Sequence, residues 1–186
     1  PACVVGTVPP YHMYGFETLV LQVLQTRVAL SVGPRSFPAD WQQSLNRAFA
    51  PRILVTTPLQ LRALVQSGLT LPVIRRVVSA SAPLGVDQAA MAEQSLDTEV
   101  TEIYGSTETG SLAIRRTISG PEWRWYDGVC LNKGLNGTEV WAPGTQAYAL
   151  ADVIEIKSDN TFLLLGRLND LIRRGKYGSG RNWWFG

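Results

Sequence analysis

Short apolar strands alternate with helical segments from residue 4 to residue 104, and this alternation limits the folds that the chain can adopt. Pro58 suits the first turn of one helix, and Gly68 suits its end. The alternation is typical of the α/β class, with a mostly parallel sheet flanked by helices, in which ligands bind beyond the carboxyl ends of the strands. Strands are predicted at residues 4–8, 27–32, 52–57, 77–80 and 99–104, and helices at residues 15–25, 40–49, 58–67 and 85–96.

The pattern changes near residue 111, where helical periodicity fades and short strands follow one another. Asn136-Gly137 and Asp159-Asn160 supply turn signals between them. The sequence therefore predicts an α/β sub-domain over residues 1–110, an antiparallel β sub-domain over residues 111–165 that forms a small barrel or distorted sheet, and a hinge segment with an atypical tail over residues 166–186. The strands of the second part are predicted at residues 111–117, 123–129, 137–141, 148–156 and 161–165.

Charge and cysteine content exclude several classes of function. The 186 residues carry 17 basic and 15 acidic side chains, a formal net charge of +2, without a basic run typical of nucleic-acid binding. The longest apolar region, residues 16–32, is interrupted by charged and amide side chains and does not predict a membrane span. Cys3 and Cys130 provide neither a disulfide framework nor a metal-binding spacing. We therefore expect a cytoplasmic protein, with no membrane span and no nucleic-acid partner.

Residues 104–110 read Tyr-Gly-Ser-Thr-Glu-Thr-Gly and directly follow a predicted strand. The ring of Tyr104 can stack on a base, and the hydroxyls of Ser106 and Thr107 can contact phosphate oxygens. The Glu108 carboxylate can bind Mg²⁺, and the glycines allow backbone to approach a ligand closely. An ordinary strand-to-turn segment could have the same composition, but the order of the residues favours a nucleotide site.

This segment resembles the adenine- and Mg²⁺-binding motif of adenylate-forming enzymes: acyl-CoA synthetases, aryl-CoA ligases, luciferases and peptide-synthetase adenylation domains. The residue order at positions 12–17 and 164–170 is most similar to that of bacterial acyl-CoA-synthetase-like AMP-ligases. The resemblance implies that Tyr104, Gly105 and Ser106 bind the nucleotide. It also implies catalytic roles for Thr107, which would contact phosphate, and for Glu108, which would bind Mg²⁺.

Two loops at predicted strand ends resemble further parts of this family's site. His12 and Gly15 lie in Pro-x-x-His-x-x-Gly, which resembles the segment that borders the acyl pocket and begins one pocket wall. A lone histidine is more often structural, but its place on a proline-rich loop at a strand end favours a site. Ser81, Ala82 and Pro83 resemble the loop whose backbone flanks the adenine, although small residues there could simply permit a tight turn.

The later part of the chain resembles the ribose-binding and hinge segments of the family. Asp152 corresponds to the aspartate that takes both ribose hydroxyls, although the chain reads Leu-Ala-Asp where the family more often has Thr-Gly-Asp. Arg167 is implied near the ribose and phosphate, and Asp170 is implied as the hinge pivot. A solvated charged turn is the simpler alternative for this segment. The residues after Lys176 depart from the family pattern.

The resemblance implies an ATP- and Mg²⁺-dependent ligase that converts a small carboxylic acid into an acyl-adenylate. The acyl group would then pass to a thiol, from CoA or from the phosphopantetheine of an acyl carrier protein. The family's phosphate loop and small C-terminal domain, each bearing a lysine, have no counterpart here, so we expect a fragment of the large N-terminal domain that is inactive alone. A non-catalytic nucleotide- or acyl-binding remnant and a generic α/β domain remain alternatives. The sequence identifies neither the acid nor the acceptor.

Overall fold

The computed structural model describes residues 1–33, 36–134, 137–142 and 145–167 of the chain. They belong to two compact units, Pro1–Pro121 and Glu122–Gly186. The first unit extends past residue 110, where the sequence suggested a boundary, because β6 (Gly110–Arg115) pairs with β5 (Val100–Ser106) inside it.

A mostly parallel sheet forms the centre of the first unit, as the sequence predicted. Its strand order is β6-β5-β4-β3-β1-β2. Every neighbouring pair from β5 to β2 is parallel, and β6 alone runs antiparallel to its neighbour within this unit. The strands not yet given are β1 (Ala2–Gly6), β2 (Val28–Ser31), β3 (Arg52–Thr56) and β4 (Arg76–Ser79).

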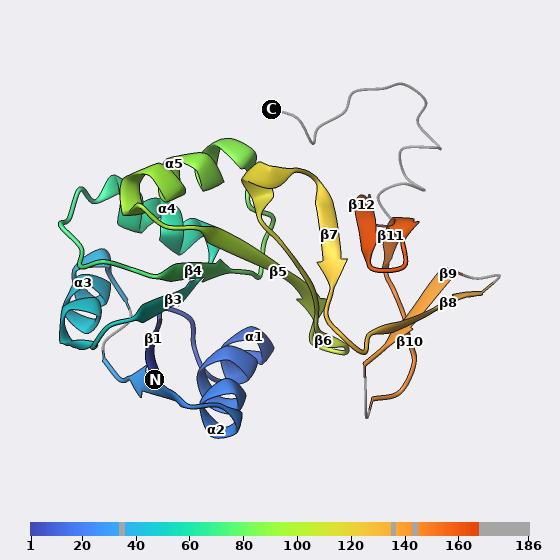
Figure 1. Ribbon diagram of the computed structural model, residues 1–186, viewed down its shortest axis with the longest axis horizontal. Coiled ribbons are helices and arrows are strands. Elements are labelled where there is room, and N and C mark those ends of the chain that lie inside the picture. Colours follow the sequence, from blue (N-terminus) through green and yellow to red (C-terminus); the bar gives the residue numbers. More distant parts are fainter. Residues whose placement is uncertain (34–35, 135–136, 143–144, 168–186) are drawn as a thin grey trace. The chain divides into compact units, whose positions relative to one another are not determined.

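Helices connect these strands and cover both faces of the sheet (Figure 1). The helix predicted at residues 15–25 consists of three consecutive segments, and its middle segment η1 has π-helical hydrogen bonding. No helix in the described ranges is long and apolar enough to cross a membrane. The helical bounds are α1 (Met13–Gly15), η1 (Phe16–Leu21), α2 (Gln22–Gln25), α3 (Pro38–Arg47), α4 (Pro58–Gln66), α5 (Val86–Leu96) and the 3₁₀ segment η2 (Thr117–Ser119).

The first unit has two hydrophobic clusters because successive strand side chains point to opposite faces. Cys3 and Val5 of β1 pack in the cluster formed with α3, α4 and α5. Val4, between them, packs in the cluster formed with Tyr14 and Leu19 from the α1–η1 segment. Strand residues buried on both faces explain the nearly continuous apolar runs in this part of the sequence.

Antiparallel β structure makes up the second unit, as predicted. In one group β12 lies between β7 and β11, and in the other β9 lies between β8 and β10. The Phe162 ring stacks on the rings of Trp123 and Trp125, with ring centroids 6.4 and 3.9 Å apart. The bounds are β7 (Glu122–Trp125), β8 (Cys130–Gly134), β9 (Gly137–Trp141), β10 (Tyr148–Ala149), β11 (Asp152–Ser158) and β12 (Thr161–Arg167).

In this unit one predicted strand was wrong in its extent, and one strand was missed. The strand predicted at residues 148–156 is interrupted at Leu150 and Ala151, because β10 pairs with β9 whereas β11 pairs with β12. Strand β8 was not predicted, since its Leu131-Asn132-Lys133 core is only partly buried and carries little apolar signal.

Candidate functional site

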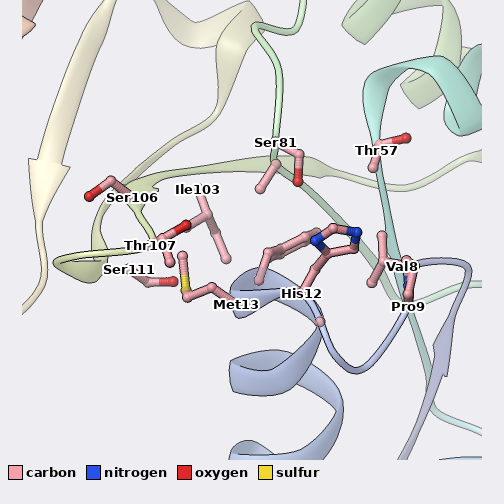
Figure 2. A pocket seen from close by; sticks show the side chains of 14 residues that line it. Val8, Pro9, His12, Met13, Thr57, Ser81, Ile103, Ser106, Thr107 and Ser111 are labelled. Carbon is pink, nitrogen blue, oxygen red and sulfur yellow. The ribbon is translucent and has the colours of Figure 1, made fainter.

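A pocket of about 450 Å³ opens where the carboxyl ends of β1, β3, β4 and β5 meet. Its volume lies in the range of small-molecule sites, and its position is where parallel α/β sheets bind ligands. Figure 2 shows the lining side chains, which come from strands β5 and β6, helix α1 and the segments that follow β1, β3, β4 and β5. They belong to Val8, Pro9, His12, Met13, Tyr14, Gly15, Thr57, Ala80, Ser81, Ile103, Gly105, Ser106, Thr107 and Ser111.

The β1–α1 loop forms one wall of this pocket. His12 is the N-cap residue of α1, where its extended backbone (φ −83°, ψ 146°) turns the chain into the helix. Its ring contacts the exposed ring of Tyr11 at a centroid distance of 5.1 Å and lines the pocket. A Cβ on Gly15 would lie 2.0 Å from the Pro9 carbonyl oxygen. Gly15 is therefore required for the loop to pack on the helix.

Tyr14 is a pocket residue that the sequence did not single out. Its ring is buried, and its hydroxyl donates a hydrogen bond to the Val78 carbonyl oxygen at 2.9 Å. The Thr18 hydroxyl in turn donates to the Tyr14 carbonyl oxygen at 2.6 Å. The Tyr14–Val78 bond connects the helix to β4, and Figure 2 shows Met13 extending toward Thr107.

The turn between β5 and β6 carries the signature residues. The Ser106 N–H donates to the Thr109 hydroxyl at 3.1 Å, and the two hydroxyl oxygens are also 3.1 Å apart. Thr107 lines the pocket, whereas Glu108 is exposed and does not line it. The pKa of Glu108 lies below its ordinary value because its carboxylate accepts hydrogen bonds from its own backbone N–H and from the Ser106 hydroxyl.

An exposed, ionised carboxylate fits the ligand set of Mg²⁺, which commonly takes one or two carboxylates together with phosphate oxygens. Across the described residues there is no group of three or more His, Cys, Asp or Glu side chains that could hold a metal by itself. Glu108 could therefore hold Mg²⁺ together with a nucleotide.

Glu17 connects the pocket helix to the start of β6 through hydrogen bonds, and the sequence did not predict this contact. Its carboxylate accepts hydrogen bonds from the N–H of Ser111, at 3.1 and 3.2 Å, and from the Ser111 hydroxyl. The only signal in the sequence was a carboxylate inside an otherwise apolar helical segment. Its partner, 94 positions away, gave no indication of the pairing.

The loop after β4 is exposed at its centre and anchored at both ends. Ser81, Ala82 and Pro83 are exposed, whereas Ala80 and Leu84 are 5% and 2% exposed. Ser81 has a φ of 77°, in the left-handed region that few non-glycine residues adopt. Ser81 lines the pocket, and Ala82 and Pro83 do not.

Tyr104 lies one residue away from the pocket-lining positions of β5. Ile103 and Gly105 line the pocket, and Tyr104 does not. The alternation of side chains along a strand places Tyr104 on the same face as Glu102, whose carboxylate accepts a hydrogen bond from the Leu84 N–H. The structure thus brings six of the predicted residues together around the pocket: His12, Gly15, Ser81, Gly105, Ser106 and Thr107.

The predicted ribose residues lie in the second unit. Asp152 and Arg167 are directly opposite each other on β11 and β12, and Arg167 Nε lies 3.7 Å from Asp152 Oδ1. The guanidinium explains how an aspartate can begin a strand, since a cross-strand cation compensates its charge. Asp170 lies outside the described residues.

The family described as AMP-binding enzyme matches residues 2–140, which include the pocket and the signature turn. The chain belongs to this family of AMP-binding enzymes. No curated protein sequence matches the chain.

Solved structures share the fold of this chain. Apo MatB from Rhodopseudomonas palustris is 21% identical with a TM-score of 0.76, over 91% of this chain and 41% of that one. The O-succinylbenzoate coenzyme A synthetase MenE from Bacillus subtilis, in complex with AMP, is 14% identical with a TM-score of 0.74, over 91% and 42%. The R195K variant of Escherichia coli MenE with bound OSB-AMS is 16% identical with a TM-score of 0.72. The chain spans 40% of that protein's length.

Proposed function

We propose that this chain is the acyl- and nucleotide-binding part of a ligase that activates a carboxylic acid with ATP. The observation that carries the proposal is the β5–β6 turn, which places Thr107 in the pocket lining and the exposed Glu108 directly beside it. Hydrogen bonds from its own backbone N–H and from the Ser106 hydroxyl lower the pKa of the Glu108 carboxyl. A carboxylate seated in the pocket would therefore lie beside a site suited to metal-bound phosphate.

The reaction proposed has two steps. A carboxylate oxygen of the acid attacks the α-phosphorus of ATP, and pyrophosphate leaves as the bond to the β-phosphate breaks. A thiol sulfur then attacks the acyl carbon, AMP leaves, and the thiol loses its proton. The thiol belongs to CoA or to the phosphopantetheine of an acyl carrier protein.

The chain's own residues would mainly position the reactants and compensate charge. We assign adenine stacking to Tyr104 and the backbone of Ser81, Ala82 and Pro83, and phosphate contact to Ser106 and Thr107. Mg²⁺, held by Glu108, would supply compensation for the charge that moves between phosphate oxygens.

The remaining assignments follow the family resemblance. Asp152, paired with Arg167, offers carboxylate oxygens that can accept from ribose hydroxyls. His12 and Gly15 border the acid, and Asp170 would serve as the hinge pivot. The free Cys3 and Cys130 are compatible with the reducing cytoplasm that we propose as its location.

Exchange of labelled pyrophosphate into ATP, measured with the full-length protein, tests this proposal. We expect exchange that requires both Mg²⁺ and a carboxylic acid. Tight ATP binding without exchange across a broad panel of acids would contradict a ligase and would favour a non-catalytic nucleotide-binding protein.

A further inference from the structure

The pocket wall carries no formal charge among the residues that the structure describes. None of its 14 lining residues is Lys, Arg, Asp or Glu. Apolar surface comes from Val8, Pro9, Met13, Ala80 and Ile103. A charged group on a bound acyl chain would find no opposite charge on this wall.

Several polar groups of the lining are already engaged within the protein. The Tyr14 hydroxyl donates to the Val78 carbonyl oxygen, and the Ser111 hydroxyl donates to Glu17. The Thr57 hydroxyl accepts from the Gln60 N–H at 3.3 Å and lies 3.1 Å from Gln60 Oε1, to which it donates. These bonds reduce the polar surface that the wall can offer to a ligand.

We propose that the acid activated here is a monocarboxylic acid whose acyl chain is uncharged and apolar. This inference rests on the proposed function, because it concerns the part of the pocket, bordered by His12 and Gly15, that is assigned there to the acid. A second carboxylate on the acyl chain would lose its hydration without gaining a cation, and an uncompensated buried charge is costly.

Matched pairs of acids test the proposal in the full-length protein. Each pair differs by a terminal methyl in place of a terminal carboxylate: 4-methylbenzoate with terephthalate, and hexanoate with adipate. We expect the methyl member to support acid-dependent pyrophosphate release with a kcat/KM about 100-fold higher or more, from the cost of an unpaired carboxylate. Met13→Lys, which places an ammonium group in the wall, should narrow this ratio at least 10-fold, and Met13→Leu should leave it unchanged.

The possible results separate this proposal from the function on which it rests. Equal or better use of the dicarboxylates by the wild type overturns the uncharged acyl chain and leaves the ligase intact. No pyrophosphate release with any acid of a broad panel overturns the ligase itself.

A different observation supports a second inference, and it concerns Glu102. This residue of β5 is 2% exposed, so its carboxylate is removed from water. It accepts hydrogen bonds from the Leu84 N–H at 2.9 Å, from Arg115 Nε at 2.8 Å and from the Thr117 hydroxyl at 2.9 Å. Both carboxylate oxygens are used, which is the condition for a stable buried charge.

Glu102 lies at the end of the pairing between β4 and β5. Its register partner is Ser79, the last residue of β4, and the exposed loop begins two residues later at Ser81. Beyond that point the loop depends on its ends, and the Leu84 N–H is held by the Glu102 carboxylate. Ser81 itself has a left-handed backbone, with a φ of 77°.

We infer that Glu102 is a positioning residue for the nucleotide loop at residues 81–83, on the premise that this loop flanks adenine as proposed above. Glu93 provides a matched control. Its carboxylate also accepts hydrogen bonds from a backbone N–H and from an arginine: the Val100 N–H at 2.9 Å and Arg116 Nε at 3.0 Å. Glu93 holds the end of α5 and has no contact with the loop among those found for it.

Glu102→Gln and Glu93→Gln should be compared in the full-length protein at a temperature at which both are folded. We expect Glu102→Gln to raise the KM for ATP about 10-fold with little change in the KM for the acid, since a hydrogen bond to a charged group is lost. Glu93→Gln should lower the melting temperature and leave both KM values unchanged. Thr117→Val removes one of the three donors to the Glu102 carboxylate and should also raise the KM for ATP. This variant serves as the test if Glu102→Gln does not fold.

Equal ATP KM values for the wild type, Glu102→Gln and Thr117→Val would overturn the positioning role. An equal rise in the KM for ATP in Glu93→Gln and Glu102→Gln would overturn the positioning role as well, because the rise would then follow from lower stability alone. Failure of the wild type to use ATP would instead contradict the proposed function.

Discussion

Gly105, near the end of β5, lies so close to the backbone of Gly110 that no side chain fits between them. The sequence led us to expect that glycines there let a ligand approach the main chain. A Cβ on Gly105 would lie 2.1 Å from the Gly110 carbonyl oxygen, so its missing side chain is required by the β5–β6 turn itself. Gly15 has the same role against Pro9. Both glycines shape the site through the protein's own packing.

Replacing Gly105 with alanine should therefore destabilise the turn. We expect a loss of about 1–3 kcal/mol in the free energy of unfolding, typical of overpacking, because the obstacle is backbone and cannot rotate away. Thermal or denaturant unfolding measures the loss. Gly85→Ala is the control, since a Cβ there meets nothing within 4 Å, and an equal loss in both variants would refute the explanation.

Tyr104 supports a prediction about nucleotide affinity. If its ring stacks on adenine, Tyr104→Ala should weaken ATP binding in the full-length protein by about 1–3 kcal/mol, and Tyr104→Phe should be nearly neutral. Isothermal titration calorimetry with ATP provides the measurement. Unchanged affinity in the alanine variant would remove Tyr104 from the site.

At the scale of secondary-structure elements, the Glu93–Arg116 pair links the end of α5 to the segment after β6. Burial by itself would raise the pKa of Glu93, but hydrogen bonds from Arg116 and from the Val100 N–H outweigh it, and the pKa lies below its ordinary value of 4.5. A carboxylate whose pKa is lowered by folding stabilises the protein when ionised, above its ordinary pKa. This stabilisation is lost as the pH falls through the lowered value.

Comparing the wild type with Glu93→Gln across pH tests this reasoning. We expect the variant to be less stable by about 1–3 kcal/mol at pH 7, the usual range for hydrogen bonds to a charged group. The difference should shrink as the pH falls from 4.5 to below the lowered pKa, because the wild-type carboxylate is then protonated. A difference that stays constant between pH 7 and pH 3 would show that charge is not involved.

The elements that the sequence predicted well are those whose signals are local. Helix α4 was predicted from Pro58 in its first turn and Gly68 after its end, and the structure adds Thr57 as its N-cap. Strand β8 was missed because its register with β9, rather than an apolar pattern, makes it a strand. The bond between Glu17 and Ser111 was missed because it joins residues far apart in the sequence, and a single sequence carries no sign of such a contact.

At the scale of the whole molecule, the sequence named many residues of the candidate site but predicted only part of their arrangement in space. The order of the signature segments was enough to indicate the family, which the match over residues 2–140 confirms. The sequence could not show that Ile103, Gly105, Ser106 and Thr107 line the pocket while Tyr104, between them, does not. That division follows from strand geometry and from the bulge after Tyr104 in the β5–β6 pairing.

The Glu108→Gln variant of the full-length protein tests the central claim most directly, with both half-reactions and the melting curve measured on one preparation. The substitution keeps the size of an exposed side chain and removes the charge proposed to bind Mg²⁺. We expect adenylation kcat to fall about 100-fold or more, as for other charge-stabilising groups, while thiol attack on a supplied acyl-adenylate stays close to wild type. The melting temperature should barely move. Adenylation at the wild-type rate per folded molecule, together with a lower melting temperature, would contradict the account and make Glu108 a structural turn residue.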